Sequence, residues 1–258
     1  MYPKDILPGI DFYLIMLCIA SVSAIFTYRF LADKKGLGAR LQNLCLFGAV
    51  AAILVGYYSA VLFQAIYNIP KYGFQITSST GATFYGGLIG GAAFFLAIYF
   101  ISGIFLFADT KEHIKNFWTV ANIGAPCIAV AHGFGRIGCL MAGCCHGKET
   151  DAWYGIYMSA VEKKVVPIQL FEAIVLFALF ALFTYRVLKG KQYNLSLYMA
   201  TYGIWRFFIE YARDDYRGYT FIPFLTPSQL TAIIMILGAV GVFLLEHFFR
   251  RKTVTDNE

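Results

Sequence analysis

The chain has 258 residues, of which 59% are hydrophobic and 14% are charged, whereas soluble domains carry roughly 25% charged residues. This composition excludes an ordinary water-soluble domain, because too few polar side chains are present to cover a core of this size. The net charge of +6 does not indicate nucleic acid as a partner, since Lys and Arg occur in short clusters between apolar runs, as loop charges of membrane proteins do.

Apolar runs along the whole chain predict transmembrane helices. Charge-free stretches such as Leu41–Pro70 and Tyr72–Ala108 exceed the roughly 18 residues that mark a membrane span. The first apolar run has no basic stretch before it, so we expect it to remain as a helix rather than to be a cleaved signal peptide. We predict an all-α polytopic membrane protein, a single domain over 1–258, with seven spans at 10–31, 43–66, 84–107, 117–134, 168–188, 194–212 and 228–249.

The basic residues between these spans predict the orientation. If the N-terminus lies outside, 12 of the 21 basic residues fall on the cytoplasmic side, close to helix ends. This excess favours an outer N-terminus and a cytoplasmic C-terminus, with a cytoplasmic tail at 250–258. The longer loops then face outward, and because loops carry much of a protein's function we expect the site there: 67–83, 135–167 and 213–227.

Several ionisable residues lie at or near predicted membrane depth, where charges are usually functional or paired. Arg206, Glu210 and Arg213 are spaced i, i+4 and i+7, so they share one helix face. Glu172 lies near the start of the fifth span. One interpretation of Arg206 and Glu210 is a neutralised structural pair. The other is that Arg136 and Arg206 converge on an anion, because guanidinium donates to two phosphate oxygens at once, which predicts a phospholipid head-group pocket.

The segment Phe84–Gly91, FYGGLIGG, opens the third span with paired glycines. Gly86 and Gly87 allow a lipid head group to approach the backbone, so we name both as substrate-binding candidates; plain helix packing is the alternative. Tyr85 offers a hydroxyl to a bound lipid or, alternatively, anchors the helix at the interface.

Six cysteines are present, and three of them fall within predicted spans, where we expect small apolar core residues: Cys18, Cys45 and Cys127.

The other three, Cys139, Cys144 and Cys145, lie together on the predicted outer side. They are compatible with a disulfide between Cys139 and one of the other two, with a reactive thiol that accepts or relays the lipid, or with inert packing. A metal site that includes His146 is possible in ligand type, but the spacing C-x4-C-C-H lacks the usual C-x2-C pair. We therefore predict no metal and no cofactor.

Five segments carry a family resemblance: FYGGLIGG (84–91), GRIGCLMAGCCHG (135–147), PIQLFEA (167–173), WRFFIEYARDD (205–215) and PSQLTAIIMILG (227–238). In this order they resemble motifs of the prolipoprotein diacylglyceryl transferases, among them Phe-His-Gly-Gly-Leu-x-Gly, Gly-Arg-x-Gly-Asn and Arg-Phe-x-x-Glu-x-x-Arg. The resemblance spans nearly the whole chain and implies seven spans with an outer N-terminus.

The resemblance implies transfer of the diacylglyceryl group of phosphatidylglycerol to a cysteine thiol of a secreted precursor, leaving a thioether and releasing glycerol phosphate. By motif position, Arg136 and Arg206 would be the catalytic ligands of the head group and leaving group. Gly138 and Gly147 would be loop glycines of the substrate site, and Glu210 a polar partner. The implied partners are phosphatidylglycerol, a prolipoprotein signal peptide or another thiol acceptor, and the bacterial cytoplasmic (inner) membrane.

Three positions differ from the family pattern. Tyr85 replaces its His, Cys139 its Asn and Cys144 its Glu. Because these are polar positions of the site, we keep Tyr85 as a catalytic candidate and Cys139 and Cys144 as substrate-binding candidates. His146 is the candidate base that replaces the missing His.

Three alternatives remain open from the sequence. The first is a transferase of the same fold with another acceptor, such as a small thiol or an alcohol. The second is a non-catalytic phospholipid-binding or transport protein that kept the head-group pocket. The third is a redox membrane protein that uses the cysteine cluster.

Overall fold

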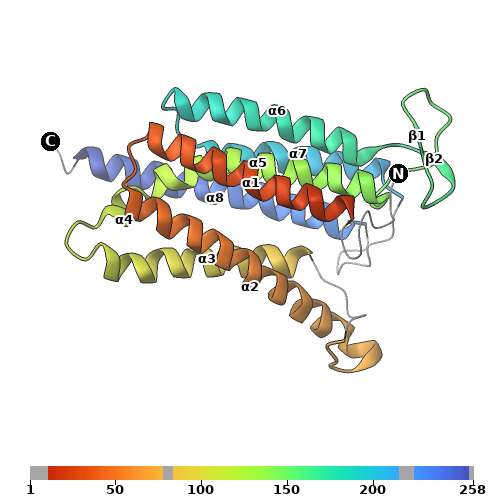
Figure 1. Cartoon of the computed structure of the whole chain (residues 1–258), viewed down its shortest axis with the longest axis horizontal. Coiled ribbons are helices and arrows are strands. Elements are labelled where there is room, and N and C mark those ends of the chain that lie inside the picture. The colour runs from red at the N-terminus through yellow and green to blue at the C-terminus, as the bar shows by residue number, and fades with distance from the viewer. Residues whose placement is uncertain (1–10, 78–83, 215–223, 256–258) are drawn as a thin grey trace. The chain divides into compact units, whose positions relative to one another are not determined.

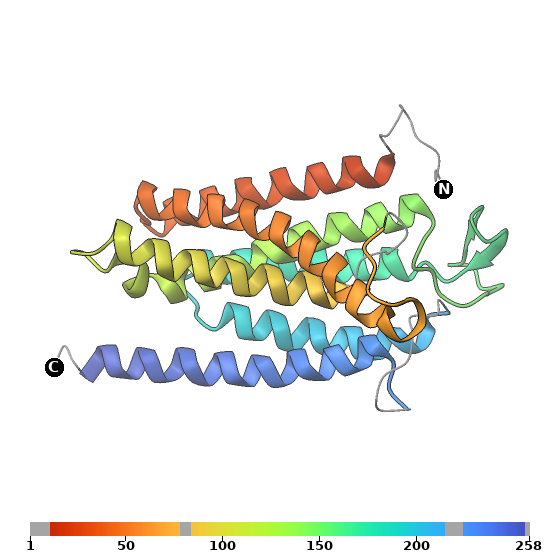
Figure 2. The same ribbon diagram turned by 90° about the horizontal axis from the view of Figure 1, so that it is seen from below.

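The computed structural model describes residues 11–77, 84–214 and 224–255, and it is built almost entirely of helices (Figures 1 and 2). Within these residues six helical segments are long and apolar enough to cross a membrane. They are α1 (Phe12–Lys34), α2 (Ala39–Tyr72), α3 (Phe84–Leu106), the short α4 (Glu112–Lys115) continued by α5 (Phe117–Ala142), α6 (Ile168–Leu188) and α8 (Pro227–Thr255). The predicted all-α polytopic membrane fold is confirmed.

The seventh predicted span, 194–212, forms a shorter helix. Helix α7 (Asn194–Ile209) has 16 residues and ends in a 3-10 turn, η1 (Glu210–Ala212). A straight crossing of the hydrocarbon core takes about 20 residues, so α7 is not among the six segments above.

Regular elements occupy parts of the predicted outer loop 135–167. Helix α5 continues to Ala142, so residues 135–142 are helical. The helix continues past Arg136 because the charge of that residue is paired inside the protein, as shown below. Farther along, strands β1 (Ile156–Met158) and β2 (Lys163–Val165) form an antiparallel hairpin in which Ile156 pairs with Val165.

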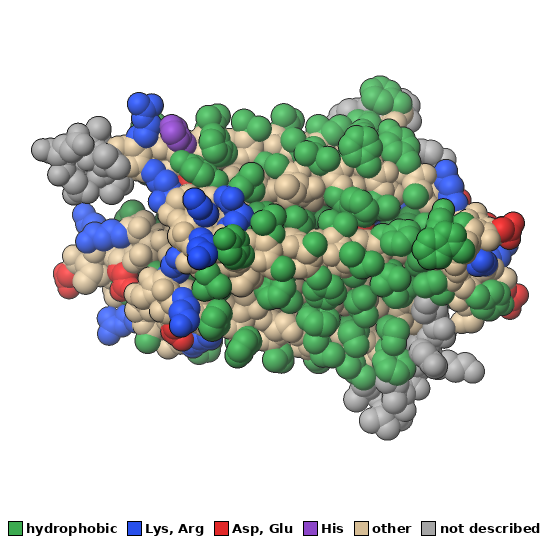
Figure 3. All heavy atoms as spheres, turned by 90° about the horizontal axis from the view of Figure 1, so that it is seen from above, with side chains coloured by type: hydrophobic (Ala, Val, Ile, Leu, Met, Phe, Trp, Pro, Cys, Tyr) green, Lys and Arg blue, Asp and Glu red, His purple; other side chains and the backbone are tan. Residues whose placement is uncertain are grey.

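Large apolar side chains cover much of the surface. Phe26, Phe47 and Phe105 are 71%, 75% and 79% exposed. Figure 3 shows a face on which hydrophobic side chains are widespread. Such exposed apolar surface is costly in water and is matched by lipid chains. Together with the six helical segments long enough to span a membrane, it shows that the chain is a multi-pass membrane protein.

The chain divides into two compact units. Residues 35–117 form the smaller unit, with α2, α3 and α4. Residues 1–34 and 118–258 form the larger unit, with α1 and α5 to α8. The core of the larger unit is made by α5, α6 and α7, whose buried side chains pack together: Ala125, Ala129, Leu176, Phe183, Tyr198 and Tyr202.

In the smaller unit, glycines bring α2 and α3 into backbone contact. A Cβ atom added to Gly56 would lie 2.9 Å from the carbonyl oxygen of Gly87, and one added to Gly91 would lie 3.1 Å from that of Ala52. A Cβ atom on Gly86 would lie 2.6 Å from the Cβ atom of Phe63 on α2. Small residues four apart on facing helices are the usual means of such close approach in membranes, and Gly86 and Gly87 both lie against α2.

We expect Gly56→Ala to lower the stability of the protein by about 1–3 kcal/mol, because the added methyl group meets backbone that cannot move aside. The matched control is Gly241→Ala in α8, where an added Cβ atom has no neighbour within 4 Å. That change should leave stability unchanged or raise it by up to about 1 kcal/mol through helix propensity. Thermal unfolding in detergent measures both, and equal effects would contradict the packing that we describe.

Candidate active site

Glu172 is a fully buried carboxylate near the start of α6, and groups from two other helices contact it. One carboxylate oxygen, Oε2, lies 3.1 Å from Nε of Arg136 on α5. The other, Oε1, accepts hydrogen bonds from Nη1 of Arg206 at 3.3 Å and from the hydroxyl of Tyr202 at 3.1 Å, both on α7. A buried charge in a membrane protein is tolerated when it is paired in this way.

A second buried carboxylate, Glu210, extends the network at the end of α7. Its Oε2 atom lies 2.8 Å from Nη2 of Arg206 and 3.5 Å from Nε of Arg213. Its Oε1 atom accepts a hydrogen bond from Thr226, and Nη2 of Arg206 also donates to the hydroxyl of Ser228 at 2.8 Å. Arg206 therefore bridges two carboxylates and the first turn of α8.

The network joins three guanidinium groups to two carboxylates. Arg206 and Arg213 are buried, and the side chain of Arg136 is 13% exposed. At low effective dielectric, a guanidinium group attracts an anion much more strongly than it would in water. The arrangement therefore suits an anion that approaches from the side of Arg136.

The sequence indicated part of this network. It singled out Arg136, Arg206 and Glu210 as site residues, and the structure brings Arg136 and Arg206 together on one side chain, Glu172. That residue stood out as a charge inside a predicted span, but nothing in the sequence placed it between the two arginines.

The tyrosine at the centre was missed. Tyr202, Arg206 and Glu210 are spaced i, i+4 and i+8, so they lie on the same face of α7, and this periodicity was the available signal. The ring of His132 on α5 lies edge-on to that of Tyr202, with a 3.4 Å contact between its Nε2 atom and the Tyr202 hydroxyl.

The segment that follows α5 forms hydrogen bonds with residues 212 and 213, just after α7, and with α6. Gly147 and Arg213 form a β-bridge, and the backbone N–H of Lys148 donates to the carbonyl of Ala212. A Cβ atom on Gly147 would lie 2.7 Å from that Ala212 carbonyl oxygen, so a glycine is needed at this position. On α6, the side chain of Gln169 donates to the carbonyl of Cys144.

The other candidate site residues lie against α1, at the end of α5 or just after it, or outside the described part of the structure. Gly138 packs against α1, where an added Cβ atom would lie 3.0 Å from the ring of Tyr13. Nδ1 of His146 lies 3.0 Å from the carbonyl oxygen of Gly147. The Tyr85 side chain lies outside the described part of the structure. Cys139 is in the last turn of α5, and Cys144 follows that helix.

Known proteins are similar to this chain over most of its length. A model of the prolipoprotein diacylglyceryl transferase family matches residues 6–245. The chain belongs to this family. It is 33% identical to phosphatidylglycerol–prolipoprotein diacylglyceryl transferase 2 of Clostridium perfringens (strain 13 / Type A) over 225 residues, which cover 83% of this chain and 81% of that protein.

Two further relatives carry the name phosphatidylglycerol–prolipoprotein diacylglyceryl transferase. The protein of Clostridium tetani (strain Massachusetts / E88) is 28% identical, with 90% of this chain and 92% of that protein covered. The protein of Campylobacter curvus (strain 525.92) is 27% identical, with 95% and 91% covered. The resemblance read from the five motifs is confirmed, and the family is one of transferases.

We expect Glu172→Gln to destabilise the protein by about 3–5 kcal/mol, because it removes the carboxylate that pairs with Arg136 and one of the two that pair with Arg206. Thermal unfolding in detergent measures the loss. The matched control is Glu149→Gln, which removes the exposed partner of Lys163, 2.7 Å away, and should leave the unfolding temperature unchanged because solvent screens that pair. A Glu172→Gln variant as stable as the control would contradict a buried, paired carboxylate.

Proposed function

We propose that the chain transfers the diacylglyceryl group of phosphatidylglycerol to the thiol of a prolipoprotein cysteine. The observation that carries the proposal is the buried network in which Arg136 and Arg206 meet on Glu172, in a member of this transferase family. The head group of phosphatidylglycerol contains a phosphodiester with one negative charge, to which these two guanidinium groups would donate.

The reaction forms one bond and breaks another at C3 of the lipid glycerol. The acceptor sulfur bonds to this carbon, and the C–O bond breaks with its electron pair passing to the phosphate. Negative charge therefore grows on the departing glycerol phosphate in the transition state. Preorganised donors aimed at growing charge are the main source of such catalysis, and Arg136 and Arg206 are suited to this role.

The carboxylates hold those arginines in place without using up their donors. A guanidinium has five N–H groups, so each arginine can keep its contact with Glu172 and still donate to a phosphate oxygen. Glu210 fixes the other end of Arg206. Glu172 and Glu210 are thus positioning residues, and the arginines are the groups that would touch the lipid.

The other candidates complete this proposal. Tyr85 is a catalytic candidate through its hydroxyl, and His146 is a candidate base for the acceptor thiol. Gly86 and Gly87 would admit the lipid at the start of α3. Gly138 and Gly147 would shape the segment beside Arg136, where Cys139 and Cys144 would face the substrate.

One assay tests the reaction and its rivals. Purified protein is incubated with phosphatidylglycerol, radiolabelled in its diacylglycerol part, and a peptide that contains a lipobox cysteine. Labelled peptide supports the proposal. Release of glycerol phosphate without labelled peptide indicates another acceptor, and lipid binding without turnover indicates a non-catalytic lipid-binding protein. Either of the last two results overturns the prolipoprotein as substrate.

We expect Arg206→Lys to lower the transfer rate by about 10²–10³-fold, because lysine keeps the charge and loses the fork of donors. The matched control is Arg250→Lys on α8, which pairs with Glu246 and should transfer within about twofold of the unaltered protein, since it lies outside the network. Rates are measured in the labelled-peptide assay, on variants whose unfolding temperatures match. A normal rate for Arg206→Lys would remove the phosphate role of this residue.

We also propose that the protein lies in the bacterial cytoplasmic membrane with its N-terminus outside, as the basic clusters near the helix ends favour. A fluorescent protein that folds only in the cytoplasm, fused after residue 258, should then fluoresce. Alkaline phosphatase, which is active only outside, should be inactive in the same position. The opposite pair of results would invert the topology.

A further inference from the structure

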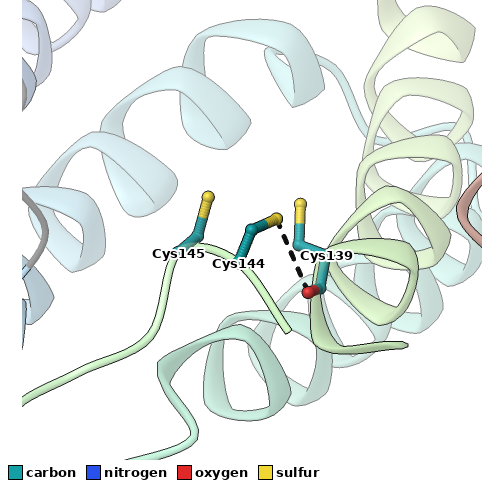
Figure 4. A group of neighbouring side chains, drawn as sticks. All are labelled: Cys139, Cys144 and Cys145. Atoms are coloured by element: carbon teal, nitrogen blue, oxygen red, sulfur yellow. Dashed lines mark hydrogen bonds between the residues drawn. The ribbon is translucent and has the colours of Figure 1, made fainter. Parts of the chain in front are cut away.

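The sulfur atoms of Cys139, Cys144 and Cys145 form a compact cluster in which all three lie within 4.8 Å of one another. Figure 4 shows the three thiols pointing to the same side of the turn that follows α5. Within the described residues this is the one group of three or more cysteine, histidine or acidic side chains close enough to bind a metal ion. His146 follows directly in sequence but contributes no atom to the group.

The backbone explains why residues so spaced come together. Helix α5 ends in a Schellman motif: Gly143 has a φ of 72°, its N–H donates to the carbonyl of Leu140, and the N–H of Cys144 donates to that of Cys139. This motif brings the side chains of Cys139 and Cys144 side by side. The backbone of Cys145 is in the left-handed region, with a φ of 61°. This conformation turns the Cys145 thiol toward the other two.

The turn is also held from outside. The side chain of Gln169 on α6 donates to the carbonyl of Cys144, and Gly147 is tied to Arg213. Preorganisation of this kind lowers the entropy that a ligand must remove on binding. In the sequence, the absence of a C-x2-C pair argued against a metal site. In the structure, the fixed turn after α5 brings the three thiols together without such a pair.

The chemistry of the three thiols suits a thiophilic cation. Three sulfur atoms within 4.8 Å of one another form a set of soft donors, and a coordinated thiol loses its proton and becomes a thiolate ligand. Zinc–sulfur bonds of about 2.3 Å place tetrahedral ligands about 3.8 Å apart, so the cluster needs only small movements to close on an ion.

The charges fit as well. One Zn²⁺ ion with three thiolates carries a single negative charge. Arg136 precedes Cys139 by three residues on α5, on the same side of the helix, so a guanidinium group lies near this negative charge. A disulfide, by contrast, would use only two of the three sulfurs.

We propose that Cys139, Cys144 and Cys145 bind one Zn²⁺ ion and leave its fourth position for the thiol of the acceptor. This inference rests on the proposed function and supplies its thiolate. Zinc sites with three protein ligands and one open position are the catalytic kind, and Cys144 is exposed, so an acceptor can reach the cluster.

The step balances without an oxidant or reductant. The acceptor thiol coordinates zinc and gives its proton to water. The zinc-bound sulfur then donates an electron pair to C3 of the lipid glycerol, and the C–O bond breaks with its pair on the phosphate. The product thioether is neutral and a weaker ligand, so it leaves the ion, which remains Zn²⁺ throughout.

Metal binding is tested first, on the full chain in detergent. We expect about one zinc per chain by elemental analysis after dialysis against metal-free buffer. Replacement by Co²⁺ should give the sulfur-to-cobalt charge-transfer band of thiolate ligation. Cys139→Ser, Cys144→Ser and Cys145→Ser should each weaken binding by at least about 10-fold, whereas the matched control Cys18→Ser, an exposed cysteine on α1, should bind zinc normally.

Zinc-free protein, a Cys139–Cys144 or Cys139–Cys145 disulfide found by mass spectrometry, or a preference for Cu⁺ that excludes zinc would each overturn the site.

The role of the open position is tested separately. Removal of zinc by a chelator should abolish transfer to the peptide and leave binding of phosphatidylglycerol vesicles intact, and added Zn²⁺ should restore transfer. Transfer that continues without zinc overturns this inference and leaves the proposed function standing. Stoichiometric zinc in a protein that transfers to no peptide supports the metal site and overturns the proposed function.

Discussion

The pairing of Glu172 with Arg136 and Arg206 is the interaction on which the larger unit depends. Without this carboxylate, two guanidinium groups would be buried side by side, and removal of one partner from such a group costs about 3–5 kcal/mol. The Glu172 side chain on α6 pairs with Arg136 on α5 and with Arg206 on α7, so it joins the three helices. The same pairing keeps both arginines in fixed positions, so stability and the proposed binding of phosphate have one structural source.

Two helices connect this network to the thiol cluster. On α6, Gln169 lies one turn before Glu172 and holds the carbonyl of Cys144. On α5, Arg136 lies one turn before Cys139. Groups that would stabilise the departing phosphate and groups that would activate the acceptor are therefore positioned by the same two helices, as a displacement at one carbon requires, because the nucleophile and the leaving group meet there.

Much of this fold follows from local sequence properties, and the site follows only in part. Long apolar runs predict the spanning helices, and charges inside those runs single out Arg136, Arg206 and Glu210. The contact of Glu172 with Arg206 joins residues 34 apart, and no local pattern specifies such a partner. The thiol cluster depends on a helix end that places the sixth residue beside the first, and a search for C-x2-C spacing does not consider this spacing. The hairpin β1–β2 lies in a polar segment without clear alternation.

The cysteines stand where the resembled family has an asparagine and a glutamate, and the arginines stand where the family has arginines. This division follows from the chemistry. Phosphate must leave with its negative charge whichever acceptor attacks, so the guanidinium groups have no substitute among neutral residues. A thiolate, by contrast, can be formed by a base or by coordination to a metal ion. The residues that would prepare the nucleophile can therefore change, as long as the arginines that would receive the leaving group stay the same.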